Sequence, residues 1–153
     1  MTVEVGQEAP DFELRGSTPE PVKLSSYRGA KAVALVFYPF TFTRVCEGEL
    51  CELRDDLARY EHADVQVLAV SCDTAPAQRK WAEEQGYQFP VLADFWPHGE
   101  VARAYGVFNE ALGCAERATF LIDRDGVVVD TFRTANIGTA READRYTEAL
   151  AKL

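Results

Sequence analysis

The stretch AVALVFYPFTFTRVCEGELCELRDDLARY, residues 32–60, decides the fold. Its first seven residues are all apolar and are rich in β-branched and aromatic side chains, which is typical of a strand buried on both faces. Residues 47–60 carry large apolar side chains from Leu50 to Tyr60 at spacings of three, four and three, so they predict an amphipathic helix. The segment therefore predicts a buried strand that leads into a helix through residues 39–46.

Further strands and helices follow this first pair. The strands are expected at residues 65–70, 89–93, 119–122 and 127–132. The helices are expected at residues 76–85, 100–105 and 140–153. Apolar residues that alternate on either side of Gly16 and Pro19 predict a short N-terminal hairpin. This order predicts an α/β protein with a thioredoxin-like fold, a mixed central sheet flanked by helices, to which the hairpin is an extension.

Length and charge restrict the class of protein. The 153 residues fit a single domain, residues 1–153, with a core large enough to be stable without disulfides. A formal net charge of -9 repels phosphate backbones and anionic membranes, so we expect no nucleic-acid or membrane partner. The N-terminus lacks the pattern of a secretory signal, and the longest apolar run is about half the length that a membrane-spanning helix needs. We therefore expect a cytoplasmic protein.

The four cysteines are Cys46, Cys51, Cys72 and Cys114. In a reducing compartment stable disulfides are rare, so any disulfide formed here is expected to be transient. The chain has no Cys-x2-Cys pair, and its two histidines fall far from each other in the sequence. That spacing argues against a zinc site, and we expect neither a metal nor a cofactor.

Cys46 stands at the start of the predicted helix 47–60. Backbone N–H groups without helical partners and the positive end of the helix dipole favour a thiolate over a thiol at such a position. A thiolate that attacks a peroxide pushes negative charge onto the leaving oxygen, so the site also needs hydrogen-bond donors along the breaking bond. Taken alone, a cysteine at a helix start is more often just a small side chain buried in the core.

Residues 39–46 read Pro-Phe-Thr-Phe-Thr-Arg-Val-Cys, which matches the pattern Pro-x3-Thr-x2-Cys of the peroxiredoxin family. Other segments that look like that family are GQEAPDF at 6–12, FWPHG at 95–99, YGVF at 105–108 and RATF at 117–120. The chain therefore resembles peroxiredoxins over almost its full length. Within them it is most similar to the alkyl hydroperoxide reductase E type.

The resemblance implies a thiol-dependent peroxidase that reduces hydrogen peroxide and organic hydroperoxides. Cys46 would be the peroxidatic residue and would become a sulfenic acid. By the same resemblance, Thr43 donates and accepts hydrogen bonds at the thiolate and the peroxide, Pro39 shields the site, and Arg117 supplies the cation. Glu49 would orient Arg117 rather than act as a base, because a carboxylate near the thiolate disfavours its ionisation. The resemblance also implies a homodimer.

The sulfenic acid must then be reduced by a thiol, and the sequence offers more than one route. Cys51 follows with a Cys-x4-Cys spacing similar to the bacterioferritin comigratory protein branch, in which the second cysteine resolves the first. The alkyl hydroperoxide reductase E type works instead with one essential cysteine and an external thiol. The implied reductant is thioredoxin-like, mycoredoxin-like or a low-molecular-weight thiol. Cys114, three residues before Arg117, remains a further candidate.

Helix geometry limits the Cys51 route. On an ideal helix the Cα atoms of Cys46 and Cys51 are about 8.7 Å apart, beyond the ~7 Å that a disulfide tolerates. A bridge therefore requires the first turns of the helix to unwind. Gly48, which lowers helix propensity between the two cysteines, makes that unwinding easier.

Two other functions compete with the peroxidase. A thioredoxin-fold disulfide oxidoreductase would need a second cysteine at position 49, which is glutamate. A non-catalytic binding or redox-sensing module on the same fold is also possible, because a fold does not determine a function. Four aromatic residues either line an apolar entrance for alkyl groups or pack in the core: Phe40, Phe42, Phe95 and Trp96.

Overall fold

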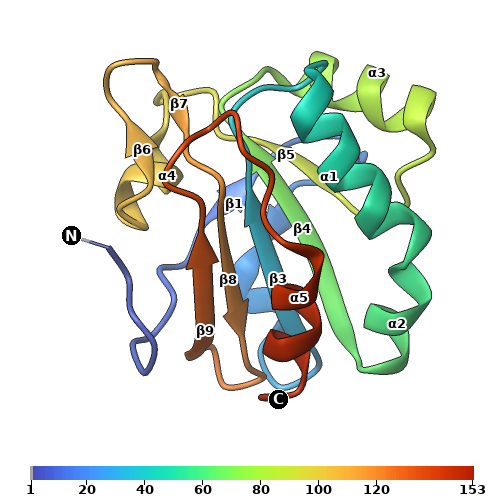
Figure 1. Ribbon diagram of the computed structural model, residues 1–153, viewed down its shortest axis with the longest axis vertical. Coiled ribbons are helices and arrows are strands. Elements are labelled where there is room, and N and C mark those ends of the chain that lie inside the picture. The colour runs from blue at the N-terminus through green and yellow to red at the C-terminus, as the bar shows by residue number, and fades with distance from the viewer. Residues whose placement is uncertain (1) are drawn as a thin grey trace.

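A five-stranded mixed sheet with strand order β5-β4-β3-β8-β9 forms the centre of the computed structural model, which describes residues 2–153 (Figure 1). Its strands are β3 (Ala32–Phe37), β4 (Val65–Ser71), β5 (Val91–Ala93), β8 (Ala118–Ile122) and β9 (Val128–Arg133). Strands β3, β4 and β5 run parallel to one another, whereas β8 and β9 are antiparallel to their neighbours. The predicted α/β class and thioredoxin-like arrangement are confirmed.

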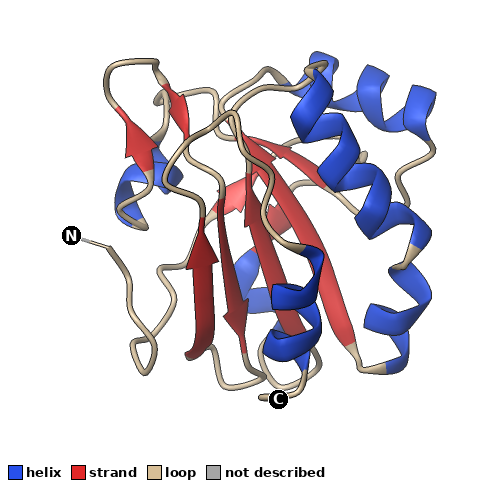
Figure 2. Cartoon of the chain, viewed as in Figure 1, coloured by secondary structure: helices blue, strands red, loops and turns tan. Residues whose placement is uncertain are grey.

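Helices cover both faces of this sheet (Figure 2). They are α1 (Arg44–Asp55), α2 (Leu57–His62), α3 (Ala75–Gln85), α4 (Glu100–Ala104), α5 (Ala143–Leu150) and the 3-10 helix η1 (Leu24–Tyr27). Apolar residues of α1, α2, α3 and α5 pack on one face, and those of α4, η1 and the N-terminal segment pack on the other. None of the helices within residues 2–153 has the length and apolar character needed to cross a membrane.

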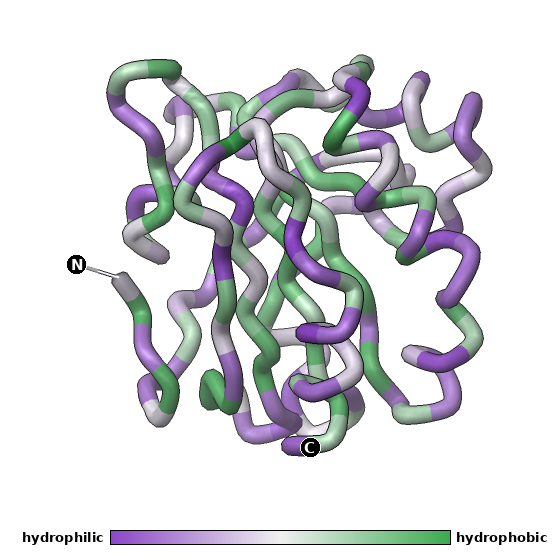
Figure 3. Tube along the Cα trace, viewed as in Figure 1, coloured by the Kyte–Doolittle hydropathy of each residue, from purple (hydrophilic) through white to green (hydrophobic). Residues whose placement is uncertain are grey.

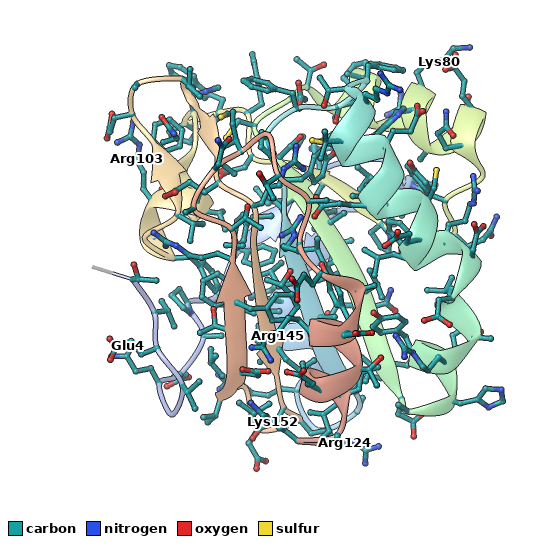
Figure 4. The ribbon with its side chains drawn as sticks, in the orientation of Figure 1. Glu4, Lys80, Arg103, Arg124, Arg145 and Lys152 are labelled. Carbon is teal, nitrogen blue, oxygen red and sulfur yellow. The ribbon has the colours of Figure 1, made fainter. Side chains whose placement is uncertain are left out.

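The apolar run at 32–38 faces both layers at once. Val33, Leu35 and Phe37 belong to the core cluster on the α4 side, whereas Val36 and Tyr38 belong to the cluster on the α1 side. Successive side chains of a strand point to opposite faces, so a strand covered on both sides needs apolar residues at every position. The hydrophobic colour is accordingly concentrated along the central strands in Figure 3, and the labelled Lys80, Arg103 and Arg124 project outward in Figure 4.

The predicted helix 47–60 is wrong in its bounds, because the structure has two helices there that are separated at Asp56. Asp56 departs from helical geometry with φ -107° and ψ 13°, and its carboxylate pairs with Arg59 at 2.8 Å. Helix α1 also begins earlier than the apolar stripe indicated, at Arg44, which makes Cys46 the third helical residue. The first turn of α1 is thus an ordered part of the helix.

Two further differences concern short elements. The predicted helix 140–153 is only α5, because the backbone N–H of Arg141 donates to the Glu49 carboxylate and residues 140–142 lie outside the helix. The hairpin of β6 (Phe108–Asn109) and β7 (Cys114–Ala115) was not predicted, since strands of two residues carry no readable alternation. The N-terminal hairpin is confirmed as β1 (Glu13–Leu14) and β2 (Val22–Lys23).

Candidate active site

Cys46 lies in the first turn of α1, beside the C-terminal ends of the parallel strands β3 and β4 (Figure 1). The residue is fully buried. Arg117 lies at the same end of the sheet because its neighbour Ala118 pairs with Phe37, the last residue of β3. Arg117 Nη1 lies 3.1 Å from Cys46 Sγ, so a sulfur at a helix start meets a guanidinium inside the protein.

The guanidinium of Arg117 is fixed by two further contacts. Its Nη1 also donates to Glu49 Oε1 at 2.7 Å, and its Nε donates to the carbonyl oxygen of Ile137 at 2.5 Å. Only 4% of the Arg117 side chain is exposed. The planar fork of arginine suits this arrangement, because one group contacts the sulfur, a carboxylate and a backbone carbonyl simultaneously.

Arg141 is a member of this cluster that the sequence analysis missed. Its backbone N–H and Nε donate to Glu49 Oε2 at 2.8 and 3.0 Å, and its Nη2 donates to Glu49 Oε1 at 2.9 Å. Its Nη1 donates to the carbonyl oxygen of Phe37 at 2.7 Å. No local signal marks Arg141, which the sequence analysis placed at the start of the predicted helix 140–153 and which meets Glu49 across 92 positions of sequence.

Glu49 is held as a carboxylate. Burial raises its pKa, but hydrogen bonds and charge from Arg141, together with the charge of Arg117, lower the pKa by more, so the net shift is downward. A carboxylate bonded to two arginines is a poor general base. The contact with Arg117 that the predicted orienting role requires is present.

The loop before α1 carries the other two predicted residues. Pro39 is buried one residue after Tyr38. Thr43 occupies the N-cap position of α1, but its side chain makes no capping hydrogen bond. Its hydroxyl instead donates to the carbonyl oxygen of Phe40 at 2.6 Å, which leaves the Thr43 oxygen free to accept.

The remaining cysteines differ in their surroundings, and all four are free thiols. Cys51 is partly exposed on α1, with its Sγ 3.5 Å from the Tyr87 hydroxyl and 3.7 Å from Gln85 Oε1. Burial raises the pKa of Cys72 to about 12. Burial, followed by the charge of Cys46, raises the pKa of Cys114 to about 11. Cys51 is therefore more accessible than either of these two buried thiols.

The four aromatic residues singled out in the sequence are exposed. Phe40, Phe42, Phe95 and Trp96 expose 37%, 53%, 47% and 82% of their surface, so packing in the core does not describe them. Within residues 2–153, no group of three or more His, Cys, Asp or Glu residues is arranged to hold a metal ion.

The sequence of this chain is similar to those of known proteins over almost its full length. The model of the AhpC/TSA family matches residues 5–131. The chain is 48% identical over 152 residues to alkyl hydroperoxide reductase E of Mycobacterium tuberculosis, and the match covers 97% of each protein. It is 36% identical over 160 residues to peroxiredoxin Bcp of Bacillus subtilis, a match that covers 100% of this chain and 96% of that protein.

Solved structures are similar over the same length. Peroxidoxin BcpB from Mycobacterium tuberculosis superposes with a TM-score of 0.85 at 31% identity, covering 98% of this chain and 96% of that one. AhpC from Enterococcus faecalis superposes with a TM-score of 0.87 at 30% identity, covering 99% of this chain and 92% of that one.

Proposed function

We propose that Cys46 is the peroxidatic residue of this chain, which belongs to the AhpC/TSA family, the peroxiredoxins, and is a thiol-dependent peroxidase. The observation that carries this assignment is the 3.1 Å contact between Arg117 Nη1 and the buried sulfur of Cys46. Cys46 is also the cysteine at the start of a helix, where the dipole and free N–H groups favour the thiolate.

In the proposed reaction, the Cys46 thiolate attacks the nearer oxygen of a hydroperoxide. The S–O bond forms as the O–O bond breaks, the leaving oxygen takes a proton to become water or an alcohol, and the cysteine becomes a sulfenic acid. Arg117 donates toward the charge that develops on the leaving oxygen. The Thr43 oxygen accepts a hydrogen bond from the peroxide, Pro39 keeps water from the sulfur, and Glu49 holds Arg117 in place.

A second thiol then reduces the sulfenic acid, forming a disulfide and releasing water. We propose Cys51 as this resolving thiol, with a thioredoxin-like, mycoredoxin-like or low-molecular-weight thiol as the external reductant. The partial exposure of Cys51 supports its role, because a resolving thiol must move toward the sulfenic acid. Since Cys46 and Cys51 share the continuous helix α1, its first turns must unwind before the bond can form.

Three broader features complete the proposal. Residues 1–153 act as one domain, which the packing of two core clusters on one central sheet supports. The protein works as a homodimer, for which the exposed rings of Phe42 and Trp96 offer apolar surface. It acts in the cytoplasm, as four free thiols suit a reducing compartment.

The test is the intact mass of the reduced protein after one equivalent of hydrogen peroxide, with peptide mapping of every cysteine. A loss of about two mass units that maps to Cys46 and Cys51 is the expected result, because it reports both roles together. A gain of about sixteen units at Cys46 would keep the peroxidatic role and replace Cys51 with an external thiol. No rapid change at Cys46 would refute the assignment and favour a non-catalytic binding or redox-sensing module.

Gly48 gives a separate test of the unwinding step. Gly48 is exposed within α1, and an added Cβ would meet no other atom within 4 Å. Gly48→Ala should stiffen the first turns of the helix by about 0.5–1 kcal/mol and slow formation of the Cys46–Cys51 disulfide about two- to fivefold. The measurement is the rate of disulfide formation after a peroxide pulse. Formation of the sulfenic acid, which needs no unwinding, is the internal control and should keep its rate; an unchanged disulfide rate would contradict the prediction.

A further inference from the structure

We infer that Asp73 is a positioning residue for the loop 39–43, and that it sets the orientation of Thr43 toward the peroxide. The inference rests on the proposed function, because it assumes that Cys46 and Thr43 act on the substrate. Asp73 lies two residues beyond the end of β4 and just before α3, beside the end of β3 where the loop begins. Its role would be exerted through the backbone of the loop.

Asp73 holds the loop through one carboxylate oxygen. Asp73 Oδ2 accepts the backbone N–H of Thr41 at 2.9 Å and the hydroxyl of Ser71 at 2.5 Å. Both donors therefore meet at the same atom. An ionised carboxylate oxygen only accepts, so it satisfies the two donors without offering a proton that would need its own partner.

A closed ring of buried hydrogen bonds supports this contact. The Thr41 hydroxyl donates to Gln78 Oε1 at 2.5 Å, and Gln78 Nε2 donates to Ser71 Oγ at 2.8 Å. The Ser71 hydroxyl donates to the Asp73 carboxylate. The backbone N–H of Thr41 donates to the same carboxylate, which closes the ring. Gln78 and Ser71 are fully buried, and Gln78 is further anchored to the carbonyl oxygen of Leu92 at 2.8 Å. Each side-chain donor of the ring thus has an acceptor within it, and satisfied buried networks of this kind are rigid.

The loop needs such a support because of Phe42. Phe42 has a φ of 65°, in the left-handed region that residues with a Cβ rarely adopt, and its side chain is more than half exposed. A conformation of this kind persists only where surrounding contacts fix it. Asp73 fixes the backbone at Thr41, and the Thr43 hydroxyl fixes the backbone at Phe40, so the turn is held from both sides.

The consequence is specific to the reaction with peroxide. Asp73 makes no contact with Cys46, whose sulfur is paired with Arg117 and lies in the first turn of α1. Loss of the Asp73 contact should therefore leave the thiolate in place. It should displace the Thr43 oxygen that accepts the hydrogen bond from the peroxide. A reagent that must reach the thiolate but needs no hydrogen bond from Thr43, such as iodoacetamide, should react with Cys46 at the same rate as in the wild type.

The experiment compares two reactions of Cys46 in the full-length reduced protein. In Asp73→Ala, the rate constant for oxidation of Cys46 by hydrogen peroxide should fall about 10- to 100-fold, because small displacements in a reacting geometry cost that much. Alkylation of Cys46 by iodoacetamide should stay within about twofold. Asp73→Asn is the matched variant: an amide oxygen in the place of Oδ2 still accepts from Thr41 and Ser71, so oxidation should be restored to within about threefold.

Several results would overturn the inference. These are an unchanged oxidation rate in Asp73→Ala, equal losses in oxidation and alkylation, or a loss in Asp73→Asn as large as in Asp73→Ala. If Asp73→Ala does not fold, Asp73→Ser replaces it, since the shorter side chain does not span the distance to the Thr41 N–H. The wild-type protein separates this inference from the proposed function: if its Cys46 is not oxidised, the proposed function fails, whereas the inference fails only on the variants.

Discussion

Replacing Arg117 with lysine should lower the rate constant for oxidation of Cys46 by hydrogen peroxide about 10²- to 10³-fold. Arg117 contacts the sulfur, Glu49 and the carbonyl oxygen of Ile137 with one rigid fork. A lysine ammonium keeps the charge but is a single point on a flexible stem, so it does not reproduce these contacts together. The donor aimed at the breaking O–O bond is then lost, although the site remains cationic.

The measurement is rapid quenching followed by mass analysis of the Cys46 peptide. The matched control is Arg133→Lys, because Arg133 lies at the end of β9, is exposed and pairs loosely with Glu116 at 3.7 Å. The control should be oxidised at the wild-type rate. Oxidation of Arg117→Lys at the wild-type rate would mean that the guanidinium takes no part in breaking the O–O bond.

Replacing Glu49 with glutamine should lower the free energy of unfolding by about 3–5 kcal/mol. The side chains of Glu49, Arg117 and Arg141 are at most 6% exposed, and the carboxylate is the shared partner of both guanidinium groups. A neutral amide removes the counter-charge that the two buried guanidinium groups share and leaves only the Cys46 thiolate beside Arg117. The loss is a large fraction of the 5–15 kcal/mol typical of a folded domain, so the variant should unfold at a much lower urea concentration.

The effect of Glu49→Gln should also depend on pH. The pKa of Glu49 is lower in the folded protein than in the unfolded chain, because the two arginines outweigh the effect of burial. The stability that the carboxylate contributes is therefore complete above the unfolded pKa of about 4.3, and it is lost as the pH falls through the folded pKa. The difference in stability between wild type and variant should accordingly shrink below about pH 4.

Urea unfolding at pH 7 and at acid pH provides both measurements. The control is Glu148→Gln, which removes a carboxylate from an exposed pair with Arg145, labelled on α5 in Figure 4. Such surface pairs contribute about 0–1 kcal/mol, so this variant should unfold almost as the wild type does. Equal effects of the two substitutions would show that the buried ion cluster contributes no more than a surface pair.

Local patterns predicted the central strands and singled out Cys46 as the candidate nucleophile, because both depend on residues near in sequence. The continuous apolar run at 32–37 follows directly from a strand that is covered on two faces. The candidate site at residues 39–46 could be proposed from sequence because a proline, a threonine and a cysteine at fixed offsets lie in one loop and one helix turn. The family that these residues resemble is confirmed by the match over residues 5–131.

Contacts between distant residues were much less predictable. Arg141 reaches Glu49 across 92 positions, and nothing in the residues around it distinguishes it from a surface arginine. Asp73 was likewise invisible, because its partner is a backbone N–H that any residue at position 41 except proline would provide. Each of these contacts exists only because the sheet brings the ends of separate strands together at one end of the sheet.

The position of Arg141 in the chain has a consequence for protein synthesis. The motif that carries Cys46 leaves the ribosome well before Arg141, the arginine that anchors Glu49. A nascent chain that has not yet reached position 141 therefore holds its thiol without the finished ion cluster. The ion cluster around Glu49 is complete only once position 141 has been made, so a product terminated before that position would keep the motif at 39–46 and lack this buried cluster.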